Sequence, residues 1–357
     1  MDNLYILDQS LNLLGVIDEY VSTIWTLSYS EIGNFEVYIG ASDKAVELLQ
    51  RNRYIVRSSD IEQDEAGNVT YRKVMIIKNI RLFTDVENGD FLTVTGRELK
   101  FVLHSRIVWS QTVLTGTAEN AIRRLITENA ISPTNPNRVI PSLALGVSAG
   151  FTETIEKQVT GDYLDEAISS IALTFGYGWD IFIYNTSLVF VLYQGFDRSY
   201  NQSERPYVVF SEKFENLYNS EYVLDSEAYA NMALVGGEGE GLARKYVTVN
   251  DELSGLERYE TLIDADSVRS NDGEITESEY LKLLAEQGSE GLASLGYTEA
   301  FTGEVLSDST FTYGVDFDLG DTVTVINPYG IEKNVKVVGA TESTDDSGLK
   351  LLPQFNA

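Results

Sequence analysis

The side chains that usually carry enzyme chemistry are scarce in this sequence. His104 is the single histidine, cysteine is absent, and 55 Asp and Glu against 26 Lys and Arg give a formal net charge of −29. Thiolate nucleophiles, disulfides and thiolate metal sites are therefore excluded. A zinc site normally needs more than one imidazole, and a Ser-His-Asp triad would have to use His104. Only carboxylate catalysis keeps many candidates, so composition favours a structural or binding protein.

Residues 146–150, Gly-Val-Ser-Ala-Gly, match the nucleophile elbow of hydrolases. That motif requires a helix after it and a histidine later in the chain. Here extended residues 151–155 follow, and His104 lies earlier. We interpret the motif as a glycine-rich surface loop. His104, at the end of a strand-like run, is interpreted as a structural or surface side chain rather than a catalytic one.

Two further glycine motifs lack part of a ligand-binding pattern. Residues 236–241, Gly-Gly-Glu-Gly-Glu-Gly, begin like a phosphate loop, but Leu242 breaks the dinucleotide pattern and two carboxylates would repel phosphate. We interpret this segment as a tight turn or bulge beside a strand. Residues 270–273 with Glu279 match part of a calcium loop, but the first ligand position is Val268. We interpret these residues as the turn before a capped helix.

The first segment, residues 1–104, reads as closely spaced short strands, which is typical of a small barrel or sandwich. Asn88-Gly89 is a strong hairpin signal, and Ser42 is a suitable N-cap for a short helix through Leu49. The expected strands span residues 4–7, 14–17, 24–29, 35–39, 54–57, 71–77, 81–86 and 91–95.

The middle of the chain has a different pattern. Thr117 caps a helix with one apolar stripe, and a second helix begins near Asp162 and ends at Gly176. Strands over 179–184 and 188–193 follow as a hairpin. Residues 105–205 are therefore predicted to form a compact α+β module.

From Tyr207 onward the pattern returns to strands. Thr276 and Glu279 form a capping box that opens a helix through at least residue 286 and as far as about 295. The expected strands of this last segment span residues 207–210, 220–224, 232–235, 244–249, 258–263, 298–305, 322–326, 333–338 and 349–355.

No apolar run approaches the roughly 20 residues of a membrane span, and the first residues lack the pattern of a signal peptide. Assembly in a bacterial cytoplasm is therefore expected. The negative charge argues against stable nucleic-acid binding, because phosphate contacts need clustered Lys and Arg. Acidic side chains lining a channel would let DNA pass without holding it. Acids spread over the outside for solubility explain the same composition equally well.

Several long blocks resemble one known family. They are residues 22–29 with 33–38, 92–97 with 106–109, 150–160, 197–201 with 208–211, and 233–241. Together they resemble the siphophage tail protein family of phages and prophages of Gram-positive bacteria. That family is similar to the N-terminal hub part of tail-associated lysins and to myophage baseplate hub proteins. The blocks keep their order over nearly the whole chain, which makes them more specific than any single motif above.

The resemblance implies a homotrimeric ring at the tip of the tail tube, with two related β-barrel tube domains in each subunit. The expected fold is mixed and mainly β: a tube-domain barrel over 1–104, the α+β module over 105–205, and a second barrel over 206–357 with a helix at about 276–295. The two strand-rich segments are consistent with this duplication. Strands near 206–240 are an alternative source for the end of the first barrel.

The implied function is structural: a tail-tip or baseplate hub protein of the virion that closes or extends the tail tube and serves genome delivery. Expected partners are further copies of the chain, tail tube and distal tail proteins, and tip, spike or fibre proteins, while DNA passes through without specific binding. No catalytic, cofactor-binding or metal-binding residue is expected, and no enzyme activity. The cysteine or zinc peptidase machinery of lysins cannot be built from one histidine and no cysteine.

A different class of function also fits the composition. An acidic surface protein that binds glycans, or a glycoside hydrolase built on paired carboxylates, would use the abundant Asp and Glu and the 21 Tyr and 15 Phe. Cleavage of a glycan or a stable monomer would favour this alternative. A ring-shaped oligomer would favour the tail hub.

Overall fold

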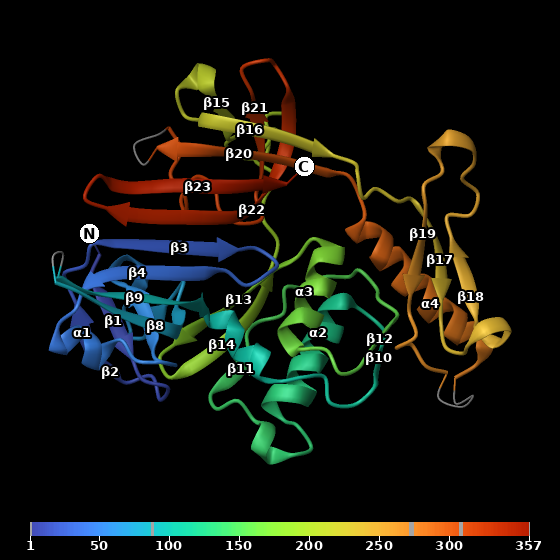
Figure 1. Ribbon diagram of the computed structural model, residues 1–357, viewed down its shortest axis with the longest axis horizontal. Helices are drawn as coiled ribbons and strands as arrows, with labels where there is room; N and C mark the ends of the chain where they lie inside the picture. The colour runs from blue at the N-terminus through green and yellow to red at the C-terminus, as the bar shows by residue number, and fades with distance from the viewer. Residues whose placement is uncertain (1, 87–88, 271–274, 307–309, 357) are drawn as a thin grey trace.

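The chain is organised around one long β-sheet that runs across the molecule (Figure 1). The computed structural model describes residues 2–86, 89–270, 275–306 and 310–356. Eight strands of this sheet follow one another in the order β16-β20-β23-β22-β3-β4-β9-β8. Strands dominate the fold and two helices lie within residues 105–205. The prediction of a mainly β fold with an α+β insert is confirmed.

The first half of the eight-stranded path comes from the N-terminal quarter of the chain. β3 (Ser22–Ser28), β4 (Asn34–Gly40), β9 (Gly89–Glu98) and β8 (Met75–Asp85) pair antiparallel in this order. Alternate residues of β3 and β4 are buried, as expected for strands with one face on a core. The core side chains of this half include Trp25, Leu27, Phe35, Val37, Leu92 and Val94.

The second half comes from the C-terminal part. Its strands also pair antiparallel, each with the next in the following order: β16 (Tyr218–Asp225), β20 (Thr298–Leu306), β23 (Gly348–Asn356) and β22 (Glu332–Asp345). The apolar residues of its inner face join the same core as the first half. One core therefore spans both halves.

The two halves repeat one pattern of strands, because β3-β4-β9-β8 corresponds to β16-β20-β23-β22. A register shift interrupts β8 between Ile77 and Asn79, and another interrupts β22 between Val337 and Gly339. When these two shifts are aligned, each residue of β8 corresponds to the residue 260 positions later in β22. The ends of the strands then coincide as well, since β8 ends at Asp85 and β22 ends at Asp345.

The same alignment brings two aromatic pairs of the core face into register. Trp25 lies opposite Phe35, with ring centroids 5.1 Å apart, and Tyr222 lies opposite Phe301, with centroids 5.2 Å apart. Following the pairings from β22 through β23 and β20 to β16 places Tyr222 at the position of Trp25. The repeat therefore extends to individual side chains.

The two halves join edge to edge through β22 and β3. Ala340 lies opposite Leu27 and Glu342 lies opposite Trp25 in this antiparallel pairing. Ala340, Leu27 and Trp25 are buried, each with at most 3% of its surface exposed. Pairing at this junction therefore buries apolar side chains as well as satisfying backbone groups.

Shorter strands extend the sheet beside each half. β5 (Tyr54–Arg57) pairs with the start of β8, and β1 (Leu4–Leu7) and β2 (Leu13–Ile17) continue from it. β21 (Thr322–Ile326) pairs with β22 in the equivalent place and carries β15 (Val209–Ser211).

The middle of the chain builds a second sheet, which is covered by two helices. Its strand order is β11 (Leu143–Leu145), β14 (Ser187–Tyr193), β13 (Gly178–Tyr184), β7 (Val69–Tyr71) and β6 (Ile61–Gln63). The β6–β7 hairpin comes from the first segment, so that segment contributes to both sheets. The predicted division of the chain at residue 104 and the two-barrel arrangement stay predictions.

Two helices pack on this second sheet, and a separate pair of strands lies beside them. α2 (Ala118–Ile126) and α3 (Leu164–Phe175) share a core with Trp179 and Phe190 of the sheet. β10 (Thr112–Leu114) and β12 (Lys157–Val159) form the separate antiparallel pair. Both strands have only three residues, and the sequence pattern predicts neither of them.

A third unit, which we call the arm, is formed by residues 226–297 between β16 and β20. β17 (Met232–Gly236), β18 (Tyr246–Val249) and β19 (Glu260–Asp264) form a three-stranded sheet, and α4 (Glu277–Ser294) packs on it around a core of its own. Figure 1 shows the arm on the right, at a distance from the long sheet. The predicted helix near 276–295 therefore belongs to the arm.

The helix ends confirm the sequence-based prediction of their caps. Ser42 caps α1 (Asp43–Leu48), Thr117 caps α2, Gly176 ends α3 in a left-handed conformation, and Thr276 with Glu279 forms the capping box of α4. One local expectation is wrong: His104 lies in a 3-10 helix, η2 (Leu99–Ser105), and not at the end of a strand. Asn88 and residues 271–273 lie outside the described residues.

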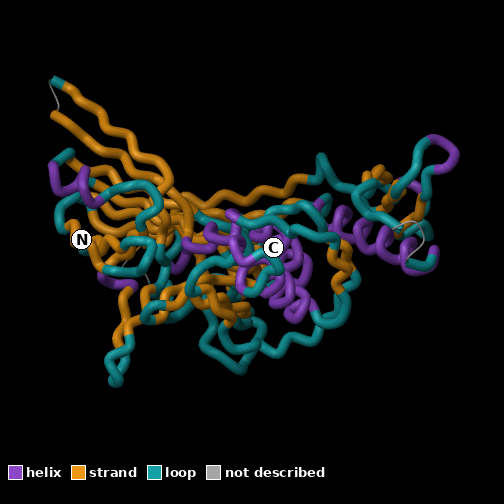
Figure 2. The backbone as a smooth tube through the Cα atoms, turned by 90° about the horizontal axis from the view of Figure 1, so that it is seen from below, coloured by secondary structure: helices purple, strands orange, loops and turns teal. Residues whose placement is uncertain are grey.

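The β8–β9 hairpin projects beyond the body of the molecule. Figure 2 shows its two strands extending at the upper left, up to the undescribed residues 87–88. Lys78 to Thr84 are partly or fully exposed, in contrast to the buried start of β8 at Met75 to Ile77. The hairpin predicted around Asn88-Gly89 is confirmed in its strands, where Asp85 lies opposite Gly89.

Candidate functional site

The single histidine, His104 of η2, packs against the start of α3. Its Nδ1 lies 3.0 and 3.1 Å from the two carboxylate oxygens of the buried Asp165. The imidazole stacks between Phe101 and Tyr163, with ring centroids 4.6 and 4.0 Å away. Stacking on both faces and a carboxylate partner fix η2 against α3. This arrangement supports the interpretation of His104 as structural.

The Gly-x-Ser-x-Gly segment is a loop held by a carboxylate that the sequence reasoning missed. Glu119, on α2, accepts hydrogen bonds from the amides of Ala149, Gly150 and Phe151 at 2.8, 2.8 and 3.0 Å. The Ser148 hydroxyl oxygen itself accepts from the amide of Gly150 at 3.3 Å. The backbone amides thus face a carboxylate of the protein, so the loop is not arranged to stabilise an oxyanion. The interpretation as a glycine-rich loop is confirmed.

We expect Glu119→Gln to lower the free energy of unfolding by about 1–3 kcal/mol at neutral pH, because an amide cannot satisfy the same set of donors. Burial raises the pKa of Glu119, but the hydrogen bonds from Ser148 and the three amides outweigh burial and hold that pKa below its usual value. The stabilisation is therefore present above the unfolded pKa of about 4.3 and is lost as the pH falls through the folded pKa.

Urea unfolding at several pH values measures this effect. The difference between Glu119→Gln and the parent chain should shrink as the pH falls below about 4. Glu128→Gln is the matched control, because Glu128 makes an exposed ion pair with Arg124 and should change stability by less than about 0.5 kcal/mol. Equal effects of the two substitutions at neutral pH would contradict the role assigned to Glu119.

The glycine-rich segment 236–241 is filled by protein side chains. Arg244 donates to the carbonyl oxygens of Gly236 and Gly237, each at 3.0 Å, and the amide of Glu238 donates to the Tyr280 hydroxyl at 2.7 Å. A Cβ atom on Gly237 would overlap that hydroxyl oxygen, so the segment packs directly on α4. The predicted turn beside a strand is confirmed. The space that a phosphate would need is taken by Arg244 and Tyr280.

Neither a metal-binding cluster nor a membrane-spanning helix occurs among the described residues. No group of three or more His, Asp or Glu among them is placed to hold a metal ion. Within the same described ranges, no helix has the length and apolarity needed to cross a membrane.

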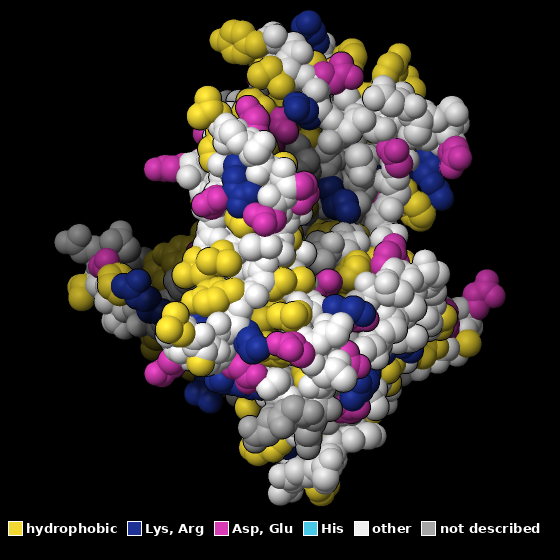
Figure 3. Space-filling model, turned by 90° about the vertical axis from the view of Figure 1, so that its right-hand side faces the viewer, with side chains coloured by type: hydrophobic (Ala, Val, Ile, Leu, Met, Phe, Trp, Pro, Cys, Tyr) yellow, Lys and Arg dark blue, Asp and Glu magenta, His cyan; other side chains and the backbone are white. Residues whose placement is uncertain are grey.

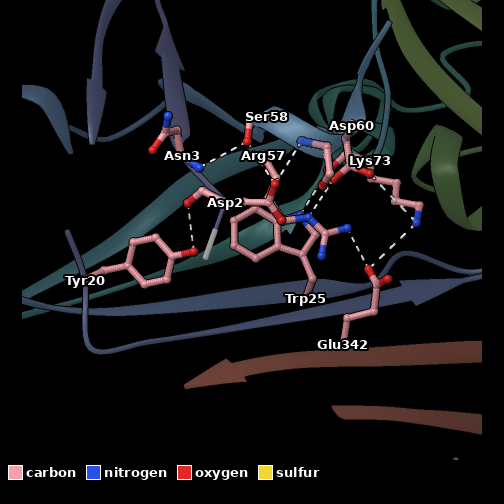
Figure 4. A network of polar contacts seen from close by, with 10 residues as sticks. Asp2, Asn3, Tyr20, Trp25, Arg57, Ser58, Asp60, Lys73 and Glu342 are labelled. Atoms are coloured by element: carbon pink, nitrogen blue, oxygen red, sulfur yellow. Dashed lines mark hydrogen bonds and ion pairs between the residues drawn. The ribbon is translucent and has the colours of Figure 1, made fainter. Parts of the chain in front are cut away.

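A buried arginine, Arg57, lies beside the junction of the two halves. Its Nε lies 2.6 Å from Asp60 and its Nη2 lies 2.6 Å from Glu342 of β22, while Lys73 lies 3.8 Å from both carboxylates (Figure 4). The guanidinium also lies over the Trp25 ring, 5.4 Å from its centroid. Burial lowers the pKa of Arg57, but the two carboxylates outweigh burial and raise it, so the guanidinium stays charged. The cluster joins the N-terminal strands to the C-terminal half.

A second buried cation joins the long sheet to the middle of the chain. Lys100 donates to the carbonyl oxygens of Ser28 and Glu31 at 2.6 and 2.7 Å, and its Nζ lies 3.1 Å from Glu98. Trp179 of β13 lies beside it, with the ring centroid 5.2 Å from Nζ. With three oxygen acceptors around it, the ammonium group is engaged in binding the sheet to its neighbours.

A cavity of about 320 Å³ with several charged groups in its wall lies where the two halves and the middle of the chain meet. Burial raises the pKa of both Asp180 and Asp318 in its wall. Three carboxyl side chains and three basic side chains contribute to this wall. The lining residues include Arg72, Lys73, Glu98, Lys100, Asp180, Tyr193, Tyr313 and Asp318.

The long sheet presents two unpaired edges to solvent. Within the described ranges, β8 from Asn79 onward pairs only with β9, and β16 pairs only with β20. Leu82 and Leu224 on these edges are 56% and 60% exposed. Unpaired backbone together with exposed apolar side chains is typical of an edge that receives a partner strand. Sequence reasoning missed these edges, because a strand pattern does not say which strands lie outermost.

A model of the Siphovirus ReqiPepy6 Gp37-like protein family matches residues 3–355. The chain belongs to this family. The predicted membership of a siphophage tail protein family is thereby confirmed, and a phage tail protein is a component of the virion. No curated protein matches the sequence.

Solved tail proteins share the fold of this Gp37-like chain. The tail protein from Neisseria meningitidis MC58 is 16% identical, with a TM-score of 0.59 over 100% of this chain and 97% of its own. The 43 kDa tail protein of prophage MuSo2 from Shewanella oneidensis is 11% identical, with a TM-score of 0.57 over 99% and 98%. The prophage tail protein gp18 from Listeria monocytogenes EGD-e is 14% identical, with a TM-score of 0.50 over 99% and 94%. At these identities the likeness establishes the fold alone.

Proposed function

We propose that this Gp37-like chain is a structural hub subunit at the tip of a phage tail. Three copies close into a ring that continues or closes the tail tube and connects it to tip, spike or fibre proteins. The double-stranded genome passes through the ring without specific binding. Assembly takes place in the bacterial host cytoplasm.

The repeat within the long sheet carries this proposal. Two four-stranded units of one topology stand side by side in one chain, joined by β22 and β3. A repeated unit with a free edge at each end of the path can be continued by further copies, and closed cyclic symmetry is the usual way for identical chains to make a ring. Three copies of a chain with two units give a pseudo-sixfold ring.

The outer face of the sheet suits a polyanion that must move past. Side chains alternate between faces along a strand, so the residues between the core positions point away from the core. Acidic residues outnumber basic ones there, which would repel DNA phosphates and prevent adhesion. These residues are Glu36, Asp85, Glu221, Asp225, Glu304, Glu332 and Asp345 against Lys78, Arg81, Arg97, Lys336 and Lys350.

The end of the molecule that carries the arm has a different surface. Figure 3 shows acidic and basic side chains interspersed there, with hydrophobic side chains gathered between them. Hydrophobic side chains surrounded by a polar rim are the usual arrangement of a contact with another protein. We assign the arm end of the molecule to contacts with neighbouring tail proteins.

The subunit is proposed to have no hydrolytic activity, and His104→Ala tests the structural role of its only imidazole. We expect unchanged infectivity of particles that carry this substitution, with a loss of about 1–2 kcal/mol in the free energy of unfolding from the unpaired Asp165. The readouts are plaque titre and urea unfolding. A large loss of infectivity at unchanged stability would show that the imidazole acts in function.

Electron microscopy of tails, with the chain located by an antibody or a fused tag, tests the proposal. A threefold ring of this chain at the tube's distal end is the expected result. A monomer that persists in the presence of the tail tube protein would contradict the hub. Release of fragments from bacterial cell walls by the purified chain would instead support a glycoside hydrolase.

A further inference from the structure

The junction inside the chain shows how its two outer edges would pair with another copy. At that junction β22 presents its edge to β3. In the repeat, β8 corresponds to β22 and β16 corresponds to β3. The free edge of β8 is therefore equivalent to the edge that β22 uses at the junction. The free edge of β16 is likewise equivalent to the edge that β3 uses there.

We propose that β8 of one subunit pairs antiparallel with β16 of the next copy, in the register of the β22–β3 junction. This inference rests on the proposed ring and names the contact that closes it. The register of the junction is transferred to the outer edges through the residue numbers. A residue of β22 corresponds to the residue of β8 numbered 260 lower, and a residue of β3 corresponds to the residue of β16 numbered 197 higher. Ile80 then lies opposite Leu224 of the second copy, Arg81 opposite Val223 and Leu82 opposite Tyr222.

The exposed apolar side chains fit this register. Ile80, Leu82 and Leu224 are 38%, 56% and 60% exposed in the single chain. At the internal junction, Ala340 and Leu27 occupy the places of Ile80 and Leu224 and are 0% and 3% exposed. The pairing would bury these side chains on the same face as the core, which gives the edges a hydrophobic reason to meet.

On the opposite face, the same register brings Arg81 close to two acidic side chains. Arg81 would stand across from Val223, whose neighbours on the same face are Glu221 and Asp225. Diagonal neighbours across antiparallel strands lie within reach of a long side chain. Arg81 of one copy could therefore reach both Glu221 and Asp225 of the next copy, which lie on either side of Val223.

The backbone continues the match beyond the strands. At the internal junction the amide of Tyr29, just after β3, donates to the carbonyl oxygen of Val338 at 2.9 Å. The corresponding groups are the amide of Ser226, at the entrance to the arm, and the carbonyl oxygen of Lys78. The arm of each copy would thus begin at the edge of its neighbour.

Disulfide trapping tests the register, because the natural chain has no cysteine. Residues directly opposite in antiparallel strands lie about 4.5–5.5 Å apart at their Cα atoms, within the range of a disulfide. Within one chain, β8 and β16 are separated by seven strand spacings of about 4.8 Å each, so a bond between them must join two copies. Arg81→Cys with Val223→Cys is the test pair.

Under mild oxidation in assembled tails, we expect the test pair to give closed covalent trimers. The matched control is Asp85→Cys with Val223→Cys, which keeps the face but shifts one partner by about 13 Å along the strand. The control should give at least tenfold less crosslinked product. Threefold rings in which the test pair links no better than the control would overturn the pairing and leave the hub intact. Tails without any ring of this chain would overturn both.

A charge exchange gives a second readout that does not depend on cysteine. Arg81→Glu should weaken ring formation about tenfold, because three carboxylates would then meet. Combining it with Glu221→Lys and Asp225→Lys should restore ring formation. Unfolding of the free chain should be unchanged, because Arg81, Glu221 and Asp225 are exposed. Failure of the combined variant to recover, with the chain folded, would contradict the pairing.

Discussion

Replacing Arg57 with Ala should lower the free energy of unfolding by about 3–5 kcal/mol, the range for breaking a buried ion pair by removing one partner. The substitution leaves Asp60 and Glu342 facing one another with little access to water, since their side chains are 7% and 12% exposed. Lys73, at 3.8 Å from both, replaces only part of the lost attraction. Because Glu342 belongs to β22, unfolding should begin at the junction of the two halves.

Chemical denaturation followed by tryptophan fluorescence measures this effect, and Lys44→Ala is its control. Lys44 pairs with Asp18 at 3.3 Å on the surface, with both side chains more than half exposed, and should contribute at most about 1 kcal/mol. Arg57→Lys should fall between the two, because an ammonium group cannot donate to both carboxylates in the same fork geometry. If Arg57→Ala and Lys44→Ala cost the same, the cluster has no special part in stability.

Local sequence signals predict the elements of this fold well where a short-range cause fixes them. The helix caps at Thr117 and at Thr276 with Glu279 depend only on residues within one turn, and both occur as expected. The strands of the β8–β9 hairpin likewise follow from alternation around a turn signal. The strand-like run before His104 is misleading, because tertiary contacts of the imidazole with Asp165 and Tyr163 hold these residues in a 3-10 helix.

Long-range pairing cannot be derived in the same way. The contact of β3 with β22 joins residues more than 300 positions apart, and a strand pattern carries no information about its neighbour. The sequence does not separate the arm from the second strand-rich segment, because its strands and those of the long sheet have the same composition and spacing. Glu119 is one carboxylate among 55 in the sequence, and only the fold places three amides around it.

The two free edges of the long sheet, on β8 and β16, are a further feature that the sequence does not reveal. Leu82 and Leu224 read as ordinary strand residues, and only the sheet order reveals that both lie on outer edges. The resemblance to tail proteins implies a duplicated subunit. Sequence similarity between the halves is too weak to align their residues. The structure supplies this alignment through the register shift at Ile77 and the corresponding shift at Val337.

Replacing Gly195 with Ala should also be strongly destabilising, by about 3 kcal/mol, because the new methyl group has no space. A Cβ atom there would overlap the carbonyl group of Gly320 and the amide nitrogen of Asp321. Both are backbone groups, and the segment is fixed by hydrogen bonds from Phe196 and Arg198 to the Asp321 carboxylate at 2.6 and 2.7 Å. The chain cannot relieve the contact without giving up these bonds.

Gly40→Ala is the matched control, because Gly40 also lies in a paired segment, has no atom within 4 Å of the position that its new methyl group would take, and has no left-handed backbone. It should change the free energy of unfolding by less than about 0.5 kcal/mol. Hydrogen exchange should locate the damage in Gly195→Ala, with faster exchange at the amides of Phe196, Arg198 and Thr322, which are protected by bonds across this contact. The contradicting outcome is unchanged exchange at these amides in Gly195→Ala, together with a free energy of unfolding equal to that of Gly40→Ala. It would show that the segment after β14 and the start of β21 separate freely. The second half of the sheet would then be held by its strand pairing alone.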